Sequence, residues 1–525
     1  MLRIQLPTIV LILVAILPSC GIPQTENAAE AREPVARFPY APTYEIFVQS
    51  FADSNDDGIG DIEGMRQKLP YLQELGIKAV WLMPVSSSPS YHKYDITDYR
   101  AIHPDYGSID DFKKFVTEAH GRDIKVIIDL VINHTDQNHP WFTESIKGPD
   151  NPYRDYYVWA DPDSVRNAYL SKGIIEPSSE YIPEWHTREN NDEIYYGFFW
   201  QGMPDLNYDN PKVREEVIAI GKFWLQEVKV DGFRLDAALY IYPKDEVQKT
   251  VAWWEEFRTE METINEDVYL VGEVWAETET TAPFLRGLDA VFNFDMGFNI
   301  VSTIRNETDS GLVDKHKSIR AAYASANPGY VDALFLTNHD QNRIMSELEN
   351  DEAKAKLAAS LLLTLPGSPY IYYGEELGMR GEKPDEFIRE PFLWKEGTDP
   401  AETSWGEVRY NTKEAISPLS IQREDPSSIY NLYKELIALR NLSAVLTYGD
   451  MQEVDDQTDE VISFTRYHEG DTLLVMHNLT GTEISADLPT AYKQYKKTFW
   501  KSSGTRLEEQ TIAMAPYGSL IIKKK

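Results

Sequence analysis

Between residues 43 and 376 the sequence repeatedly alternates a short, apolar, strand-like run with a longer stretch of helical periodicity. The strand-like runs are TYEIFVQSF, AVWLMPV, KVIIDLVIN, GFRLDA, YLVGEVW, AVFNFDM, ALFLTNHD and SPYIYYGEE. The stretches between them place apolar residues at helical spacing, as at positions 62, 65, 69, 72 and 75. Strands that alternate with helices favour a parallel sheet, and eight of them within about 340 residues predict an α/β fold, a closed (β/α)8 or TIM barrel.

Two segments depart from this repeat and predict further domains. Residues 135–207, after the third strand, are rich in Tyr, Trp, Pro and Asp and are far longer than a usual βα loop. After a helical pattern at 429–440, the runs EVISFTRY, TLLVMHNL and SLIIKKK alternate like antiparallel strands. We therefore expect a barrel domain A at 39–134 and 208–445, a small inserted domain B at 135–207, and a C-terminal antiparallel β-sandwich, domain C, at 446–525.

The N-terminus is typical of an exported protein. Arg3 precedes an apolar run at residues 9–17, which is too short for a comfortable membrane span. Cys20, the single cysteine, follows the letters LPS and resembles the lipobox of bacterial lipoproteins. The resemblance implies a signal peptide at 1–19, a lipid anchor on Cys20, a flexible tether at 20–38, and a place at the cell envelope, on the outer surface or in the periplasm. A plain secretory peptide with an incidental cysteine is the alternative, and the intact mass of the mature protein distinguishes the two.

The charge balance excludes one class of partner. The chain has 51 Lys and Arg against 85 Asp and Glu, a formal net charge of −34. Because nucleic-acid binding depends on cations that replace phosphate counterions, we expect no nucleic-acid partner. The acidity fits an exported protein with a neutral substrate, although a saline habitat also accounts for it. We expect a monomer.

Polar residues gather where the predicted strands end. They are Asp129, Asn133 and His134 after the third strand, Arg234 and Asp236 after the fourth, Glu273 after the fifth, and His339 and Asp340 after the seventh. In such barrels the active site is built at the carboxyl ends of the strands, so these side chains should converge on one pocket. For Arg234 and Asp236 alone, a structural ion pair is an equally good interpretation.

Four of these stretches resemble a known family. DLVINH, GFRLDAALY, VGEVW and FLTNHD match, in order, the four signature regions of the α-amylase family, glycoside hydrolase family 13, and MPDLN at 203–207 resembles its fifth. The resemblance implies that Asp236 is the nucleophile, Glu273 the proton donor and acid/base, and Asp340 the carboxylate that stabilises the transition state. The chemistry agrees, because a retaining glycosidase needs one ionised and one protonated carboxyl group. Arg234 should keep Asp236 ionised, whereas the apolar strand and neighbouring carboxylates should keep Glu273 protonated.

The same resemblance implies a substrate-binding set. In SYHKYDITDY, His92 and Tyr94 match the family's sugar-binding pair, while His134 and His339 match the histidines that bind sugar hydroxyls. Arg234 belongs to this set as well. The aromatic cluster in EIYYGFFWQG supplies either further sugar platforms or simple packing between domains.

The loop DSNDDGIGD predicts a calcium site. Asp53, Asn55, Asp57, the carbonyl of Ile59 and Asp61 present oxygen atoms at alternate positions around a glycine turn, as a hard cation requires. The twelfth position is glycine rather than glutamate, so the loop is not an EF-hand. It resembles the calcium loop of oligosaccharide-cleaving members of the family. A solvated acidic turn is the alternative.

Departures from the family pattern concern specificity. Many α-amylases continue the nucleophile motif as DAAKH, whereas this chain has Leu239 and Tyr240 in place of the Lys and His. MPDLN and the acidic loop favour the α-glucosidase, neopullulanase and cyclomaltodextrinase side, whereas His92 and Ala237 favour α-1,4-cleaving amylases. The combination resembles bacterial α-amylases of a group intermediate between amylases and oligo-1,6-glucosidase or neopullulanase-type enzymes.

We therefore expect retaining endo-hydrolysis of α-1,4-glucosidic bonds in starch and maltooligosaccharides, with transglycosylation as a possible side reaction. An α-glucosidase or neopullulanase-type hydrolase of short oligosaccharides is the alternative. A non-catalytic starch-binding lipoprotein is a remote one, since binding alone gives no physical reason to keep Asp236, Glu273 and Asp340 together.

Overall fold

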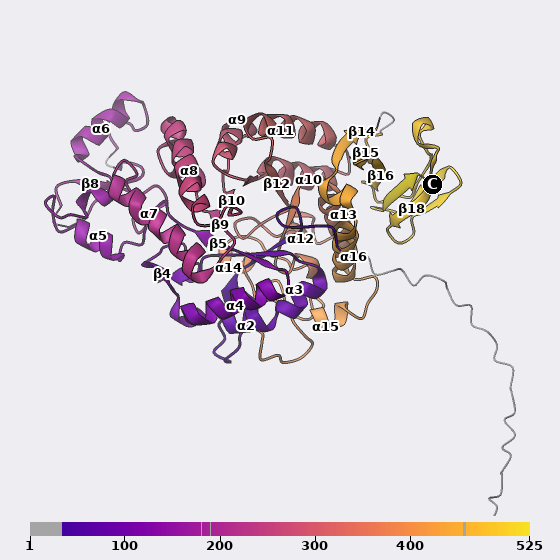
Figure 1. The fold of residues 1–525 in the computed structure, drawn as a ribbon, viewed down its shortest axis with the longest axis horizontal. Helices are drawn as coiled ribbons and strands as arrows, with labels where there is room; N and C mark the ends of the chain where they lie inside the picture. Colours follow the sequence, from indigo (N-terminus) through magenta and orange to yellow (C-terminus); the bar gives the residue numbers. More distant parts are fainter. Residues whose placement is uncertain (1–33, 180, 190, 455–457, 525) are drawn as a thin grey trace, which may run out of the picture. The chain divides into compact units, whose positions relative to one another are not determined.

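The computed structural model describes residues 34–179, 181–189, 191–454 and 458–524, so that the predicted lipid-bearing Cys20 lies outside the described residues. Its centre is a closed parallel barrel in the order β1-β13-β12-β11-β10-β9-β5-β2 (Figure 1). The strands are β1 (Thr43–Ile46), β2 (Ala79–Leu82), β5 (Lys125–Leu130), β9 (Gly232–Leu235), β10 (Tyr269–Gly272), β11 (Ala290–Phe292), β12 (Val331–Phe335) and β13 (Ser368–Tyr372). These are the eight predicted runs, and the (β/α)8 barrel is confirmed.

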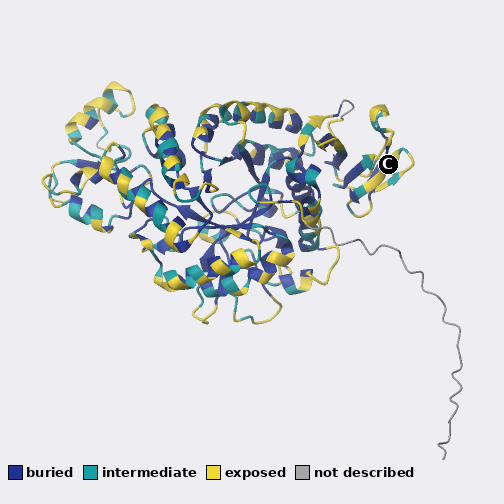
Figure 2. Ribbon diagram, in the orientation of Figure 1, coloured by how far each residue is buried: buried dark blue, intermediate teal, exposed yellow. Residues whose placement is uncertain are grey.

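Strand side chains alternate between the inside of the barrel and the surrounding helices, as the two-residue period requires. On β2, Ala79 and Trp81 belong to the inner cluster, whereas Val80 and Leu82 pack into the outer one. The inner cluster is filled largely by bulky rings and branched chains, including Ile127, Tyr269, Val271, Phe292, Val331, Phe335 and Tyr370. The barrel is therefore a packed core, visible as the buried strands in Figure 2.

Helices cover the outside of the barrel. They include α2 (Ile62–Gln67), α3 (Leu69–Leu75), α4 (Ile109–Gly121), α7 (Pro211–Phe223), α8 (Val247–Glu262), α10 (Phe294–Asn306), α11 (Leu312–Ala326), α13 (Glu352–Thr364) and α16 (Ile429–Leu442). No helix of the described ranges is both long and apolar enough to cross a membrane.

Three sequence runs are divided more finely than their patterns predict. The helical run at 62–75 breaks at Lys68, because Pro70 has no N–H to donate to the carbonyl of Arg66 and instead takes a place in the first turn of α3. The first strand ends at Ile46 and is followed by the short helix α1 (Val48–Phe51). The run AVFNFDM leaves the sheet after Phe292, since the Asn293 side chain accepts a hydrogen bond from Met296 N and begins α10.

The segment between β5 and α7 has its own small sheet in the order β6-β8-β7. Its elements are α5 (Pro140–Ser145), β6 (Trp159–Ala160), α6 (Pro162–Ser171), β7 (Trp185–His186) and β8 (Ile194–Tyr196). Phe142 packs against Tyr195 and Trp159, which gives the sheet an aromatic core. The chain then returns to the barrel, where Leu206 N donates to Asn133 O directly after β5.

The C-terminal region consists of two antiparallel sheets. The first has the order β14 (Asp450–Glu453), β15 (Val461–His468), β16 (Asp471–Asn478), β21 (Ser519–Lys524), β18 (Tyr495–Lys501); the second has the order β17 (Ile484–Asp487), β20 (Thr511–Met514), β19 (Arg506–Glu508). A separate apolar cluster, with Leu474, Leu488 and Ile512 among its members, draws side chains from both sheets. The predicted C-terminal antiparallel β-fold is therefore confirmed.

Candidate active site

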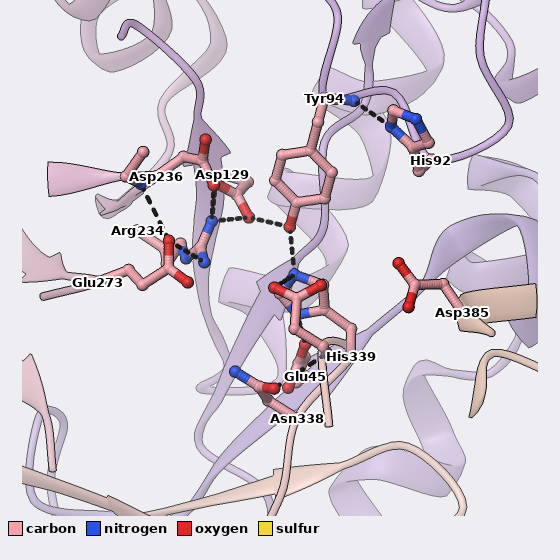
Figure 3. A network of polar contacts seen from close by, with 12 residues as sticks. Glu45, His92, Tyr94, Asp129, Arg234, Asp236, Glu273, Asn338, His339 and Asp385 are labelled. Atoms are coloured by element: carbon pink, nitrogen blue, oxygen red, sulfur yellow. Dashed lines mark hydrogen bonds and ion pairs between the residues drawn. The ribbon is translucent and has the colours of Figure 1, made fainter. Parts of the chain in front are cut away.

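Arg234 lies at the centre of a buried cluster of carboxylates. Its Nη1 donates to both oxygens of Asp129, at 2.9 and 3.0 Å, and to Asp236 Oδ1 at 2.6 Å. Its Nη2 is 3.0 Å from Glu273 Oε2 (Figure 3). Arg234 and Asp129 occupy strand positions whose side chains point to the inside of the barrel. Asp236 and Glu273 directly follow β9 and β10. The structure thus brings together these four residues, which the sequence placed at the ends of three strands.

One guanidinium faces three carboxylates here, so the cluster holds more negative than positive charge when every group is ionised. Burial raises the pKa of Asp236 and of Glu273, although Arg234 opposes the shift in both cases. Burial likewise raises the pKa of Asp129 to about 7. The cluster therefore retains protons at mildly acidic pH and titrates as one coupled unit.

The sequence spacing predicted an ion pair of Arg234 with Asp236 alone, and this prediction missed the second ion pair with Glu273. Arg234 also approaches Glu273, so that it favours the ionised form of both carboxyl groups. The two differ in geometry, because Arg234 makes a hydrogen bond to Asp236 and only a close ion pair with Glu273. Glu273 Oε2 instead accepts from Ala237 N at 3.0 Å, and Ala237 has a left-handed φ of 47°. A strained backbone directly after Asp236 thus orients the second carboxyl group.

Asp340 is held by a histidine and an arginine. His339 Nε2 lies 3.1 Å from Asp340 Oδ2, and Arg389 Nη2 lies 3.0 Å from Oδ1. Burial alone raises the pKa of Asp340, but His339 and Arg389 outweigh it and hold that pKa well below its usual range. Asp340 is therefore an ionised carboxylate across the neutral range, in contrast to the cluster around Arg234.

These groups surround a cavity of about 210 Å³. Its lining consists of His92, Tyr94, His134, Phe199, Met203, Asp236, Glu273, Asp340, Asp385 and Arg389. Arg234 and His339 are both fully buried and lie behind this lining, where they contact the carboxylates. They are therefore placed to set charge and orientation, while His92, Tyr94 and His134 line the space itself.

The two lining histidines are uncharged at neutral pH. Burial lowers the pKa of His134 to about 4, and it also lowers the pKa of His92. His134 Nε2 lies 2.9 Å from the carbonyl of Tyr94, so it carries the proton and donates. His92 Nδ1 accepts from Tyr94 N at 3.1 Å. Neutral rings that can donate or accept suit a polar, uncharged ligand.

Glu45, Asp385 and Arg389 belong to the site but were not predicted. Arg389 Nη2 contacts Asp385 as well as Asp340, at 3.2 and 3.0 Å. Glu45 is a charged residue inside the otherwise apolar strand β1, and that alone could have marked it. Asp385 and Arg389 follow the eighth strand at some distance, and no local pattern distinguishes them.

The aromatic cluster near residue 198 divides between packing and the cavity wall, and its use as a sugar platform stays a prediction. Tyr195 is buried and packs on Phe142, which is a structural role. Phe198 stacks on Tyr240 with ring centroids 4.2 Å apart, and Phe199 lines the cavity. Tyr240, where the family pattern has a histidine, therefore helps hold the segment that carries Phe199.

In the acidic loop at 53–61, side-chain oxygens organise the backbone. Asp53 accepts hydrogen bonds from Asn55, Asp56 and Gly58 N, and Asp61 accepts from Ser54 and Gly64 N. Asn55 and Asp57 each accept from the N–H two residues further on. Among the described residues, no group of three His, Cys, Asp or Glu side chains is close enough to hold a metal ion. The calcium site stays a prediction.

Comparison with known proteins places this geometry in context. The family model described as "Alpha amylase, catalytic domain" matches residues 45–449, and the model described as "Alpha-amylase SusG C-terminal domain" matches residues 461–521. A crystal structure of an α-amylase from H. orenii is similar with a TM-score of 0.82 and 42% sequence identity, and the match covers 92% of this chain and 99% of that one.

Curated relatives include several activities. "Alpha-amylase 3" of Dictyoglomus thermophilum is 41% identical, covering 91% of this chain and 92% of the relative. A "4-alpha-glucanotransferase" of Thermotoga neapolitana is 35% identical, with 84% and 96% covered, and an "Oligo-1,6-glucosidase" of Parageobacillus thermoglucosidasius is 33% identical, with 84% and 90% covered. Hydrolases and a transferase thus share this architecture.

Proposed function

This chain belongs to the α-amylase family, glycoside hydrolase family 13, and we propose that within this family it is an endo-acting α-amylase that retains anomeric configuration. Glycosidase activity on α-glucans follows from the family. The position of attack, the bond preference and the roles of individual residues are the proposal. The observation that carries it is the cavity in which Asp236, Glu273 and Asp340 meet, with Arg234 buried behind them.

In the proposed first step, Asp236 attacks the anomeric carbon and forms a glycosyl ester. Glu273 gives its proton to the departing glycosidic oxygen, so that the leaving chain departs as a neutral alcohol. Two observations support these separate roles. Arg234 donates a hydrogen bond to Asp236, the carboxylate that must be anionic, and burial raises the pKa of Glu273, the group that must hold a proton.

In the proposed second step, Glu273 is ionised and removes a proton from water, which attacks the ester carbon and releases Asp236. Asp340 keeps its charge throughout because His339 and Arg389 hold it. It is therefore suited to bind sugar hydroxyls and to stabilise the positive charge that develops on the sugar ring. The neutral His92 and His134 and the ring of Tyr94 offer polar and stacking contacts to the same sugar.

The preference for α-1,4 bonds in long chains is supported by the similarity to "Alpha-amylase 3" and by His92 in the cavity lining. An enzyme that trims short oligosaccharides is the second candidate, favoured by the likeness to an oligo-1,6-glucosidase. The likeness to a 4-alpha-glucanotransferase favours some transfer of the glycosyl group to a sugar instead of water.

A time course of products from soluble starch, a linear maltooligosaccharide and a cyclodextrin tests the proposal. Endo-attack predicts mixed oligosaccharides from starch in the first minutes, with a rapid loss of viscosity. Glucose or maltose alone from the outset would favour the second candidate. Products longer than the added maltooligosaccharide would reveal transfer.

We also propose that the loop at 53–61 binds a calcium ion with a structural role. Asp53, Asn55, Asp57, the carbonyl of Ile59 and Asp61 would hold it, since each side-chain oxygen that accepts an N–H keeps a second lone pair. Bound calcium would bridge carboxylates that otherwise repel one another. Gly64 N donates to Asp61 Oδ1 of the loop at 2.7 Å, and a Cβ at Gly64 would lie 2.1 Å from the carbonyl of Ala52, directly before the loop.

If the loop holds calcium, EDTA should lower the melting temperature by a few degrees, and added Ca²⁺ should restore it, because the ion binds only the folded state. Asp57→Ala should abolish the response to EDTA. Asp56→Asn is the matched control, since the neighbouring side chain is outside the proposed ligand set and should leave the response intact. A wild-type melting temperature unmoved by EDTA contradicts the site.

A further inference from the structure

Both ring nitrogens of His339 face oxygen atoms in a region from which solvent is excluded. His339 is fully buried and Glu45 is 2% exposed. His339 Nδ1 lies 2.6 Å from Glu45 Oε1, and Nε2 lies 2.6 Å from Tyr94 Oη (Figure 3). The same Nε2 lies 3.1 Å from Asp340 Oδ2. The ring therefore links β1 to two residues that line the cavity.

The direction of these hydrogen bonds can be assigned. Both oxygens of Asp129 accept from Arg234 Nη1, so Tyr94 Oη, which lies 3.0 Å from Asp129 Oδ2, donates there and accepts from His339. Glu45 and Asp340 are likewise acceptors when ionised. A neutral imidazole has a single N–H and can satisfy only one side, which would leave a buried acceptor unpaired on the other. The geometry thus calls for a proton on each nitrogen.

We propose that Glu45 is a positioning residue that keeps His339 doubly protonated, so that the Nε2–H of His339 holds Tyr94 and Asp340 in their working geometry. This inference rests on the proposed function, because it assigns a role within the same site. Glu45 is not among the residues that line the cavity, so it acts on the reaction only through the histidine.

The charges around His339 agree with this assignment. Glu45 faces the ring from β1, Asp340 follows it in the chain, Tyr94 lies over it with its ring stacked 5.5 Å away, and Trp81 of β2 packs against its edge. Asp129, Arg234 and Arg389 lie one contact further out, on Tyr94 or Asp340. Although burial lowers the pKa of His339, Asp340 and Glu45 raise it to about 9.

Glu45→Gln tests the role of the charge while keeping the shape of the side chain. The glutamine oxygen can still accept from Nδ1, but the carboxylate no longer favours the imidazolium, whose pKa should fall by about 1–3 units. The readout is kcat/KM for α-maltosyl fluoride against pH. Fluoride departs without a proton from Glu273, so the alkaline limb reports His339 and should move down with its pKa.

Glu376→Gln is the matched control, because Glu376 is equally buried and accepts hydrogen bonds from Tyr44 and Tyr71 without facing His339. It should lower the melting temperature and leave the alkaline limb in place. A folded Glu45→Gln variant whose limb coincides with that of wild type overturns the proposal.

A second measurement does not depend on the variant folding. The ¹⁵N shifts of the His339 ring in the wild-type enzyme, assigned with a His339→Gln variant, should show both nitrogens protonated up to about pH 8. A neutral His339 ring at pH 7 overturns the proposal. If wild type releases neither fluoride nor sugar, the proposed function fails, and a comparison of the ring titration in wild type and in Glu45→Gln still decides the role of Glu45.

Discussion

Replacement of Asp236 by asparagine is expected to lower kcat for starch by on the order of 10⁴-fold or more, because the amide cannot form the glycosyl ester. Asparagine has the same shape and can still accept the hydrogen bond from Arg234 Nη1, so the cavity should persist. The substitution also removes one of three carboxylates that share a single guanidinium, and this should keep the melting temperature near that of wild type. Reducing-sugar release and thermal unfolding measure the two effects.

Asp231→Asn is the control for this substitution. Asp231 precedes β9 at its opposite end, where it pairs with His120 and Lys125 rather than with any cavity residue. Its replacement should cost stability, since it breaks these contacts, and should spare kcat. Normal turnover in a well-folded Asp236→Asn variant would exclude Asp236 as the nucleophile.

Replacement of Glu273 by glutamine is expected to lower kcat/KM for starch by about 10²–10⁴-fold, the usual contribution of general acid catalysis. For α-maltosyl fluoride, the glycosylation step should be nearly unaffected, because fluoride needs no proton to depart. The fall of kcat/KM for starch at alkaline pH follows from the direction of the Glu273 pKa shift. The required acid form of Glu273 exists below its raised pKa and is lost as the pH rises through that value. The Glu273 limb should therefore be lost in the variant, and only the limb that reports His339 should remain.

Azide separates this effect from a loss of folding. An anion attacks the glycosyl ester without a base, so azide should restore turnover of α-maltosyl fluoride in Glu273→Gln and yield a glycosyl azide. Glu277→Gln changes an exposed residue of the same loop and should behave like wild type. Equal losses with starch and with the fluoride would show that Glu273 does not act as the acid.

The barrel could be predicted from the sequence because its strands are mostly apolar and alternate with stretches of helical periodicity. A strand such as Lys125–Leu130 is buried on both faces, so it lacks the polar alternation of a surface strand. The ends of strands and helices were harder to predict, since they depend on single residues. Pro70 divides a run that is otherwise periodic, and Asn293 starts a helix inside a run that looks like a strand.

The convergence of Asp129, Arg234, Asp236, Glu273 and Asp340 was also predictable, because parallel strands in a barrel deliver their carboxyl ends to one face. The contact of one guanidinium with carboxylates from neighbouring strands was not predictable. Arg234 and Asp236 are two residues apart, whereas Glu273 approaches the same guanidinium from the neighbouring strand β10. Local spacing cannot report a contact set by strand pairing and register.

Glu45 shows the same limit more strongly. It lies 294 positions from His339 in sequence, and the two meet only because β1 and β13 close the ring beside β12. The one signal in the sequence was a carboxylate on an apolar strand, which has a cost unless it is paired. A buried carboxylate of this kind indicates that a partner exists, but the sequence does not show which residue that partner is.

The central claim is that Asp236 carries the glycosyl group, and peptide mass spectrometry of Glu273→Gln treated with α-maltosyl fluoride tests it most directly. Fluoride departure needs no acid, and hydrolysis of the ester lacks its base, so the intermediate should accumulate. One added maltosyl group is expected on the peptide that contains Asp236. A maltosyl group on any other residue, or steady fluoride release from an enzyme that stays unmodified, would contradict it.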